Sequence, residues 1–220
     1  MSRQLPLFPL GTILFPGMTI NLHIFEERYR SMIATCIEQR MPFGIVLIRA
    51  GDEVEEGRLG AAPAEPHLVG TTAEISANVR LEDGRFLLTA VGRERFTIRQ
   101  ITQRHPYLVA SVQVLEEDVA PGVTKAAEEL RAMYLRYWKA VEVATGVPVE
   151  PDELPSDPAT MAYQLADRLQ VPLARKQHWL EAPLLARLYE MASDLRAELA
   201  LMPGSQDGAG QGFAGLGSLN

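Results

Sequence analysis

Apolar residues in the first half of the chain recur mainly with a period of two, the spacing of a strand with one buried face. The clearest example is the stretch 69–79, where Val, Thr, Ala and Ile alternate with mostly polar neighbours. The stretch 43–48 (FGIVLI) is apolar throughout and predicts a buried strand. Asp83-Gly84 predicts a hairpin turn into another strand over 86–91.

Gly92 is expected to break the strand over 86–91, and two further strands are predicted over 95–101 and 107–115. Residues 50–66 are rich in Gly, Ala, Pro and acidic residues and predict a long surface loop. Six or more mostly antiparallel strands within about 115 residues predict a small closed or half-closed barrel.

The first twenty residues contain the tripeptide LFP twice, at residues 7–9 and 14–16. Because each proline removes one donor from a strand ladder, we expect short strands at a sheet margin or at bulges. Such a margin is open to partners.

One helix interrupts the strands. In residues 21–32 (NLHIFEERYRSM) the chain passes from strand-like to helix-like sequence without Gly or Pro, and Glu26 and Glu27 suit the first turn of a helix. Pro42 ends it. The apolar stripe that this helix packs on the preceding strand is Tyr29, Met32, Ile33, Cys36 and Ile37.

The period becomes helical after Pro121-Gly122. An apolar stripe extends over 126–141, and Asp157-Pro158 supplies an N-cap followed by proline at the first helical position. Further helices are predicted over 159–169, 173–180 and 183–201.

These elements predict an α+β fold, with a mostly antiparallel pseudo-β-barrel followed by an α-helical bundle. We expect the barrel with its one packed helix over 1–118, the bundle over 119–202 and a disordered Gly-rich tail over 203–220.

The composition, 47% hydrophobic and 22% charged residues among 220, is that of an ordinary globular protein. A formal charge of −7 repels a phosphate backbone, so nucleic acid is not the default partner. The single cysteine, Cys36, leaves no internal disulfide and no paired-thiol zinc site. Prolines interrupt the apolar N-terminus and no apolar run approaches ~18 residues, so we expect no signal peptide, no membrane span and a cytoplasmic location.

The residues give little support for catalysis. Residues 210–215 match the dinucleotide motif G-x-G-x-x-G, but that motif requires a strand before it and a helix after it. The histidines form no i, i+4 pair, no Gly-Lys-Ser/Thr occurs, and Cys36 is expected to be a core residue. We therefore expect no catalytic residue, no cofactor and no metal site.

Six arginines face only three acidic residues in the stretch 80–104. If the strands bring some of them to one barrel face, Arg80, Arg93 and Arg95 are candidates to contact an anionic or acidic-peptide partner. The alternative is that they form the polar side of half-buried strands.

Several separated stretches resemble a known family. LPLFPLGTILFPGMTINLHIFEERYRSM, PFGIVLI, VGTTAEI, VGRERFTI and YLVASVQVLEE resemble, in order and spacing, the N-terminal domain of Lon proteases in its stand-alone form. The segment ADRLQVPLARKQHWLEAPLLARLYEMASDLRAEL resembles the helical bundle that follows. The match covers about residues 5–201, and HIFEERYR is its most specific motif.

This resemblance implies a PUA-like pseudo-barrel with a helical subdomain that recognises unfolded or tagged polypeptides, as an accessory to ATP-dependent proteolysis. A separate protease or ATPase is then an expected partner. Because no ATPase or Ser-Lys peptidase sequence follows Leu201, we expect a binding protein and not an enzyme.

The two LFP segments suggest where polypeptides bind. Leu7, Phe8, Phe15, Pro16 and Met18 are predicted to line an apolar groove beside a strand margin, where extended peptides add. The alternative is that both phenylalanines belong to the core.

Two other functions stay open. PUA-like barrels elsewhere bind RNA, which the basic strands over 80–104 would serve, with a steep dependence on salt. A hydrolase is the weakest hypothesis, because no nucleophile, base and orienting group can be placed together.

Overall fold

A computed structural model describes residues 3–51, 64–117 and 120–202 of the chain. The predicted tail over 203–220, the dinucleotide-like motif over 210–215 and most of the predicted loop over 50–66 lie outside the described residues.

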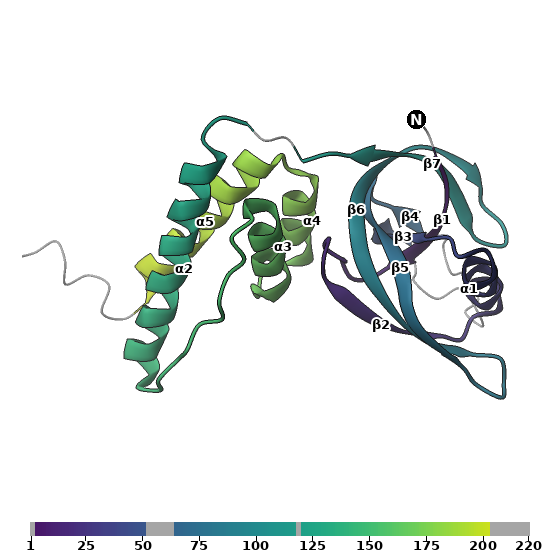
Figure 1. Ribbon diagram of the computed structural model, residues 1–220, viewed down its shortest axis with the longest axis horizontal. Coiled ribbons are helices and arrows are strands. Elements are labelled where there is room, and N and C mark those ends of the chain that lie inside the picture. The colour runs from purple at the N-terminus through teal and green to yellow at the C-terminus, as the bar shows by residue number, and fades with distance from the viewer. Residues whose placement is uncertain (1–2, 52–63, 118–119, 203–220) are drawn as a thin grey trace, which may run out of the picture. The chain divides into compact units, whose positions relative to one another are not determined.

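The described residues contain a seven-stranded sheet that closes on itself (Figure 1). Its hydrogen-bonded order is β1-β7-β6-β5-β3, and β3 pairs in turn with β1, so these five strands form a ring. β2 pairs with β6 and β4 pairs with β3. The strands are β1 (Arg3–Leu10), β2 (Thr19–Ile24), β3 (Phe43–Ala50), β4 (Glu65–Pro66), β5 (Val69–Arg80), β6 (Phe86–Gln103) and β7 (Leu108–Leu115).

Only the β1–β3 pair is parallel, so the predicted, mostly antiparallel barrel is confirmed. Five described helices accompany it, which confirms the α+β class. The helices are α1 (Glu27–Gln39), α2 (Val123–Thr145), α3 (Pro158–Arg168), α4 (Leu173–Glu181) and α5 (Leu184–Leu201).

The chain divides into two compact units that differ from the boundaries expected from sequence. Of the described residues, 3–51, 64–117 and 155–184 form the barrel unit, and 120–154 and 185–202 form the helical unit. The reason is that α4 is tied to the barrel through its own backbone and side chains. The side-chain amide of Gln177 donates to the carbonyl of Val69 at 3.0 Å, and Arg95 of β6 donates to the carbonyl of Leu180 at 2.7 Å.

The helical unit contains α2 and α5. Leu130 and Met133 of α2 and Leu195 of α5 are buried, as the apolar stripe predicts. An ion pair between Arg196 and Glu129, 2.5 Å from Nη2 to Oε1, connects the two helices.

α1 has the sequence-predicted position and buried face. Tyr29, Met32, Ile33 and Cys36 are buried on the barrel. The helix ends at Arg40, which has φ 51° and donates its N–H to the carbonyls at the end of the last turn.

α3 begins with the predicted cap. The Thr160 N–H donates to Asp157 Oδ2 at 2.8 Å, and Pro158 occupies the first turn. Hydrogen bonds from the Thr160 hydroxyl and N–H lower the pKa of the Asp157 carboxyl.

The barrel core has two clusters, and β1 contributes to both because its side chains alternate between its two faces. Leu5 and Leu7 belong to one cluster with Phe96. Phe8 belongs to the other, where its ring centroid lies 4.2 Å from that of Tyr29 of α1.

The expected open sheet margin is not found at β1, which lies between β7 and β3 in the closed ring of strands. It pairs with β7 through Arg3–Leu7 and with β3 through Leu7–Leu10. Prolines 6 and 9 are compatible with this position, because each half of β1 is paired on one side only and every second N–H there has no ladder partner to serve.

Gly92 does not break the strand either. β6 continues through it, and its backbone exchanges two hydrogen bonds of 2.9 Å with the loop before β2, from Gly17 N–H to the Gly92 carbonyl and from Gly92 N–H to the Met18 carbonyl. A Cβ at position 92 would lie 2.4 Å from the carbonyl oxygen of Phe15. Glycine therefore allows this loop to approach the strand closely.

Candidate functional site

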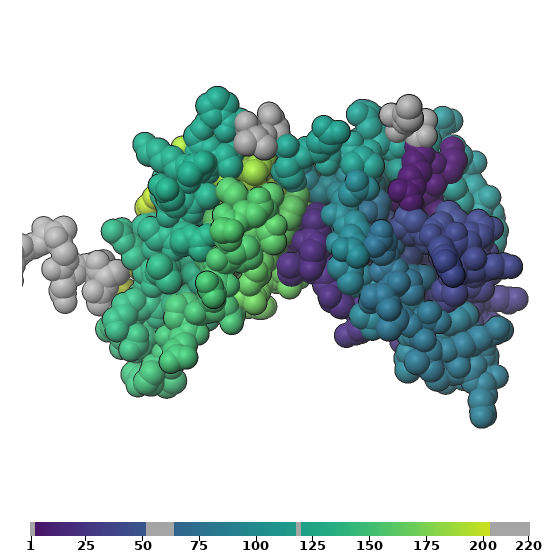
Figure 2. All heavy atoms as spheres, in the orientation of Figure 1, coloured from purple at the N-terminus to yellow at the C-terminus, as the bar shows by residue number. Residues whose placement is uncertain are grey.

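A groove of about 360 Å³ lies between the C-terminal end of α1 and β5 in the barrel unit. In the space-filling view, the surfaces of α1 and of the β5–β6 hairpin are neighbours (Figure 2). The lining residues are Cys36, Ile37, Arg40, Met41, Pro42, Glu74, Ile75 and Asn78.

The inner wall of the groove is apolar. Ile37, Met41 and Ile75 are half-buried and pack against the core cluster beneath α1. Cys36 is also in this wall but is only 1% exposed. Burial raises the pKa of its thiol to about 11, so near neutral pH Cys36 is an uncharged packing residue and not a nucleophile.

The rim of the groove is polar and exposed. Glu74 is neutralised by Arg93 of β6, whose Nε lies 2.7 Å from Glu74 Oε2. Arg40 is exposed and forms no ion pair within the described residues. The rim therefore carries one uncompensated positive charge beside an apolar wall.

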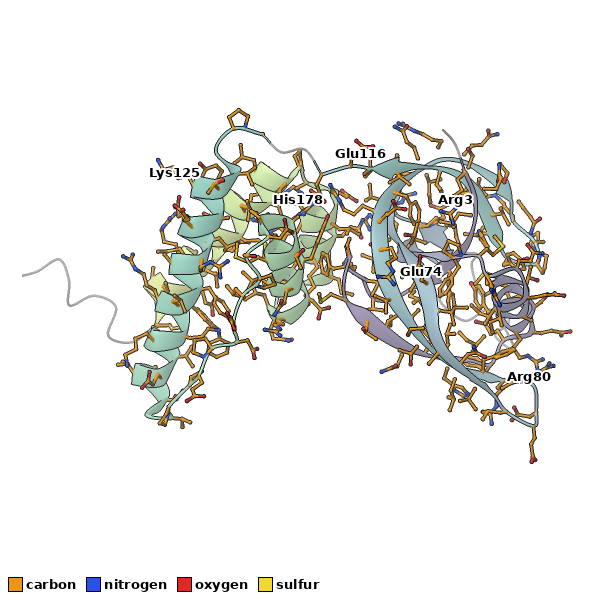
Figure 3. The ribbon with its side chains drawn as sticks, in the orientation of Figure 1. Arg3, Glu74, Arg80, Glu116, Lys125 and His178 are labelled. Carbon is orange, nitrogen blue, oxygen red and sulfur yellow. The ribbon has the colours of Figure 1, made fainter. Side chains whose placement is uncertain are left out.

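One edge of β5 is unpaired next to the groove. β5 pairs with β6 along most of its length, but with β3 only through Thr71–Ala73. On the side of β5 away from β6, no strand in the described part of the chain pairs with the stretch from Glu74 to Arg80. These two residues are labelled in Figure 3. The backbone of this stretch thus has hydrogen-bonding groups to offer.

α1 follows this free edge. Its N-terminal part reaches the β5–β6 turn, where Arg30 Nη1 donates to the carbonyl of Asp83 at 3.1 Å. Its C-terminal part lines the groove opposite Glu74, Ile75 and Asn78. The groove is therefore a channel with helix on one side and open strand backbone on the other.

The five residues predicted to bind peptides lie elsewhere. Leu7 and Phe15 are 0% exposed and Phe8 is 7% exposed, so they do not line an open groove. Pro16 and Met18 are half-buried, and Met18 packs against the core beneath α1. The side chains of Leu7 and Phe8 are buried because β1 uses both of its faces for the core.

Arg95, one of three candidate anion contacts, is also buried. It is 5% exposed and connects the barrel to the end of α4, donating to the carbonyls of Leu180 at 2.7 Å and Ala182 at 3.1 Å. Its Nε lies 2.8 Å from Glu117 Oε1. Arg95 therefore stabilises the barrel unit and cannot contact an external anion in this conformation.

Arg80 and Arg93, the other two candidate anion contacts, have different surroundings. Arg93 is paired with Glu74 in the groove rim. Arg80 is exposed, with its guanidinium 5.7 Å from the ring centroid of Phe86. Arg85 is paired with Asp83 at 2.7 Å. Three of the six arginines in the stretch 80–104, Arg85, Arg93 and Arg95, are thus paired with carboxylates, which weakens the case for binding of a phosphate backbone.

The comparisons with known proteins agree with this architecture. A model of the "ATP-dependent protease La (LON) substrate-binding domain" matches residues 4–195. The chain belongs to this family. The family resemblance noted in the sequence is thereby confirmed.

Relatives of this LON substrate-binding domain include Lon proteases. The Lon protease of Anaeromyxobacter dehalogenans is 24% identical over 196 residues, which are 87% of this chain and 22% of the relative. Lon protease 2 of Syntrophobacter fumaroxidans is 26% identical over 189 residues, 83% of this chain and 23% of the relative. The chain thus spans about a fifth to a quarter of the length of these curated relatives.

Solved structures share the fold. A Lon N-terminal domain protein from Xanthomonas campestris is 25% identical, with a TM-score of 0.55 over 91% of this chain and 99% of that one. The N-terminal domain of Mycobacterium avium complex Lon protease matches with a TM-score of 0.61 at 16% identity, over 88% of this chain and 98% of that one, and shows the fold alone.

Among the residues described here, no three His, Cys, Asp or Glu side chains lie together as a metal site would require. None of the helices in the described ranges has the length and apolar character needed to cross a membrane.

Sequence reasoning missed the groove, although parts of its signal were visible. Ile37 was placed on the apolar stripe of the helix and Ile75 on the buried face of its strand, so both were expected to be core. Their partial exposure arises because β3 leaves β5 after Ala73 and α1 does not cover the gap. That gap is set by pairing between distant strands, which a single sequence does not display.

Proposed function

We propose that this LON substrate-binding domain binds non-native polypeptide segments, without catalysis, in the groove between α1 and β5. The observation that carries the proposal is a groove with an apolar wall, formed by Ile37, Met41 and Ile75, that runs along unpaired strand backbone. The family description, substrate binding within an ATP-dependent protease, supports the same role.

The chemistry of the groove fits weak and permissive binding. Burying an aliphatic side chain contributes about 1.5–3 kcal/mol. Two such side chains in the groove correspond to dissociation constants of about tens of micromolar to millimolar, before the cost of ordering the segment. Because Met41 is flexible, the wall accepts side chains of different shapes.

A client held this weakly can be released to a second component. The curated relatives are Lon proteases, which are four to five times as long as the aligned region. We propose that polypeptides bound here are passed to an ATP-dependent protease or ATPase, and that the domain increases their local concentration there.

The test is binding of a fluorescently labelled, permanently unfolded protein to the purified chain. Ile37→Asp replaces an aliphatic group of the wall by a charged one and is expected to weaken binding at least about tenfold, because an apolar client side chain loses the surface against which it packs. Ala34→Asp introduces the same residue at an exposed position of the same helix and is the matched control, with binding expected within about twofold of wild type.

Circular dichroism melting of both variants shows whether the fold is retained. Equal binding by wild type and a folded Ile37→Asp variant would remove the groove as the site. Absence of binding to any unfolded protein by wild type would overturn the proposed function. Competition by RNA that weakens steeply with salt would instead favour the RNA hypothesis.

A further inference from the structure

We propose that the polypeptide bound in the groove adds to β5 as an extended strand along Glu74–Asn78, and that the substrate class is segments without basic residues that have aliphatic residues at alternate positions. This inference rests on the proposed function and specifies the form in which the client is bound.

The backbone of this stretch is satisfied on one side only. In a strand, N–H and C=O groups of successive residues point alternately to the two sides. Those of Glu74–Asn78 that face β6 belong to the β5–β6 ladder, whose register covers Glu74, Ile75, Ala77 and Asn78. Those on the opposite side have no backbone partner among the described residues.

The edge lacks most of the features that keep strand edges from pairing. Such edges usually carry lysine, proline or inward-pointing charge. The stretch 74–78 reads EISAN, without lysine or proline, and its one acidic side chain is neutralised by Arg93. A register shift between Ile75 and Ala77 is the single protective feature that the β5–β6 ladder shows here.

The groove leaves room for a strand beside this edge. Five extended residues cover roughly 17 Å at about 3.4 Å per residue, and the groove lining runs from Glu74 to Asn78 on the strand side. An added strand turns every second side chain toward the wall made by Ile37 and Met41, and the others toward solvent. The required pattern is thus aliphatic at alternate positions.

The charge at the groove rim further restricts the class of polypeptide segments that fit. With Glu74 compensated by Arg93, the uncompensated charge at the rim is that of Arg40. A lysine or arginine of the client next to Arg40 is repelled, and proline lacks the donor that a ladder needs. Segments with alternating Val, Ile or Leu and without basic residues or proline therefore fit the channel best.

Backbone N-methylation tests the strand directly. The probe is a seven-residue peptide with Val at alternate positions and Ser between them, compared with two versions that are N-methylated on the Val or on the Ser residues. Only one set of amides faces β5. One version is therefore expected to lose at least about tenfold in affinity and the other to stay within about twofold, since each lost ladder bond weakens binding several-fold.

Hydrogen exchange by NMR provides the second readout. On binding of the parent peptide, the amides of Glu74–Asn78 that do not face β6 are expected to exchange more slowly, while the amides of β1 do not change. A peptide with the same composition and a proline at its central position is expected not to protect them.

The possible outcomes separate this inference from the proposed function. Loss by one methylated version together with protection of Glu74–Asn78 supports strand addition. Equal binding of both versions, or equal loss, overturns it, even if Ile37→Asp still abolishes binding and the groove function stands. Failure of the parent peptide to bind, while an unfolded protein binds in an Ile37-dependent manner, overturns the substrate class alone. Binding of both probes that is insensitive to Ile37→Asp overturns both proposals.

Discussion

β1 and the second half of β5 lie in the same barrel, but they differ in how accessible their side chains and backbone are to a partner. β1 is paired on one side through its first half and on the other through its second, and its apolar side chains fill both core clusters. The stretch Glu74–Asn78 of β5 is paired with β6 alone, carries one half-buried aliphatic residue, Ile75, and borders an open groove. The strand that is richer in apolar residues is thus the less accessible one.

If the open edge of β5 binds polypeptides as proposed, the apolar content of a strand does not identify the binding strand. Apolar residues on a strand enclosed between two neighbours stabilise the fold. A strand edge that is left open has both backbone groups and space to offer, even when its own side chains are mostly polar. In this barrel the open edge exists because β3 leaves β5 after Ala73.

The largest expected effect concerns the buried phenylalanines of the N-terminal segment. Phe8→Ala and Phe15→Ala each remove a ring that is at most 7% exposed and are expected to lower the free energy of unfolding by about 3–5 kcal/mol. Urea denaturation measures the loss. Binding of an unfolded protein by the fraction that remains folded should not change. A variant with near-wild-type stability but weakened binding would return the site to the N-terminal segment.

A second pair of variants applies the same comparison to arginines of β5 and β6. Arg95→Ala removes a buried cation that pairs with Glu117 and donates to two backbone carbonyls. The free energy of unfolding is therefore expected to fall by about 3–5 kcal/mol. Arg80→Ala, at an exposed position, should cost less than about 1 kcal/mol. Thermal melting distinguishes them, and comparable effects would show that Arg95 is not a structural residue.

Gly92→Ala tests how closely the loop before β2 packs against β6. Its Cβ would lie 2.4 Å from the carbonyl oxygen of Phe15, and the expected cost is about 1–3 kcal/mol because backbone must shift. Ser76→Ala on the open side of the barrel is the comparison, with a change within about 1 kcal/mol. If both substitutions cost the same, the close approach at Gly92 contributes nothing.

The smallest expected effect on stability serves as a reference for the others. Asp157→Ala removes the cap of α3, far in sequence from both strands, and is expected to cost about 1 kcal/mol without changing polypeptide binding. The pKa of the Asp157 carboxyl is lowered in the folded state, so its contribution is present above the ordinary aspartate pKa of about 4 and is lost as the pH falls below it. The stability difference between wild type and the variant, measured by urea denaturation from pH 7 to pH 2.5, should therefore shrink at low pH. Weaker binding by this variant at neutral pH would mean that binding responds to stability in general.

Much of the local structure could be predicted from sequence. The stripe from Tyr29 to Cys36 forms α1, the Asp157-Pro158 pair starts α3, and the alternation over 69–79 forms β5. These predictions succeed because period, caps and turns act within a few residues of one another. The candidate site could not be found in this way. Prolines 6 and 9 suggested a margin, but whether a strand has neighbours on both sides depends on residues about a hundred positions away.

The sequence by itself determined the family, the α+β class and the order of strands and helices, because these follow from local periodicity and from motifs such as HIFEERYR. Only the tertiary structure decided which strand buries both of its faces and which borders an open groove, that α3 and α4 belong with the barrel, and that Arg95 points into the protein. The physical reason is that closing a barrel pairs β1 with both β3 and β7. That non-local pairing, and not the hydrophobicity of any one segment, sets which strand edge remains unpaired beside the groove.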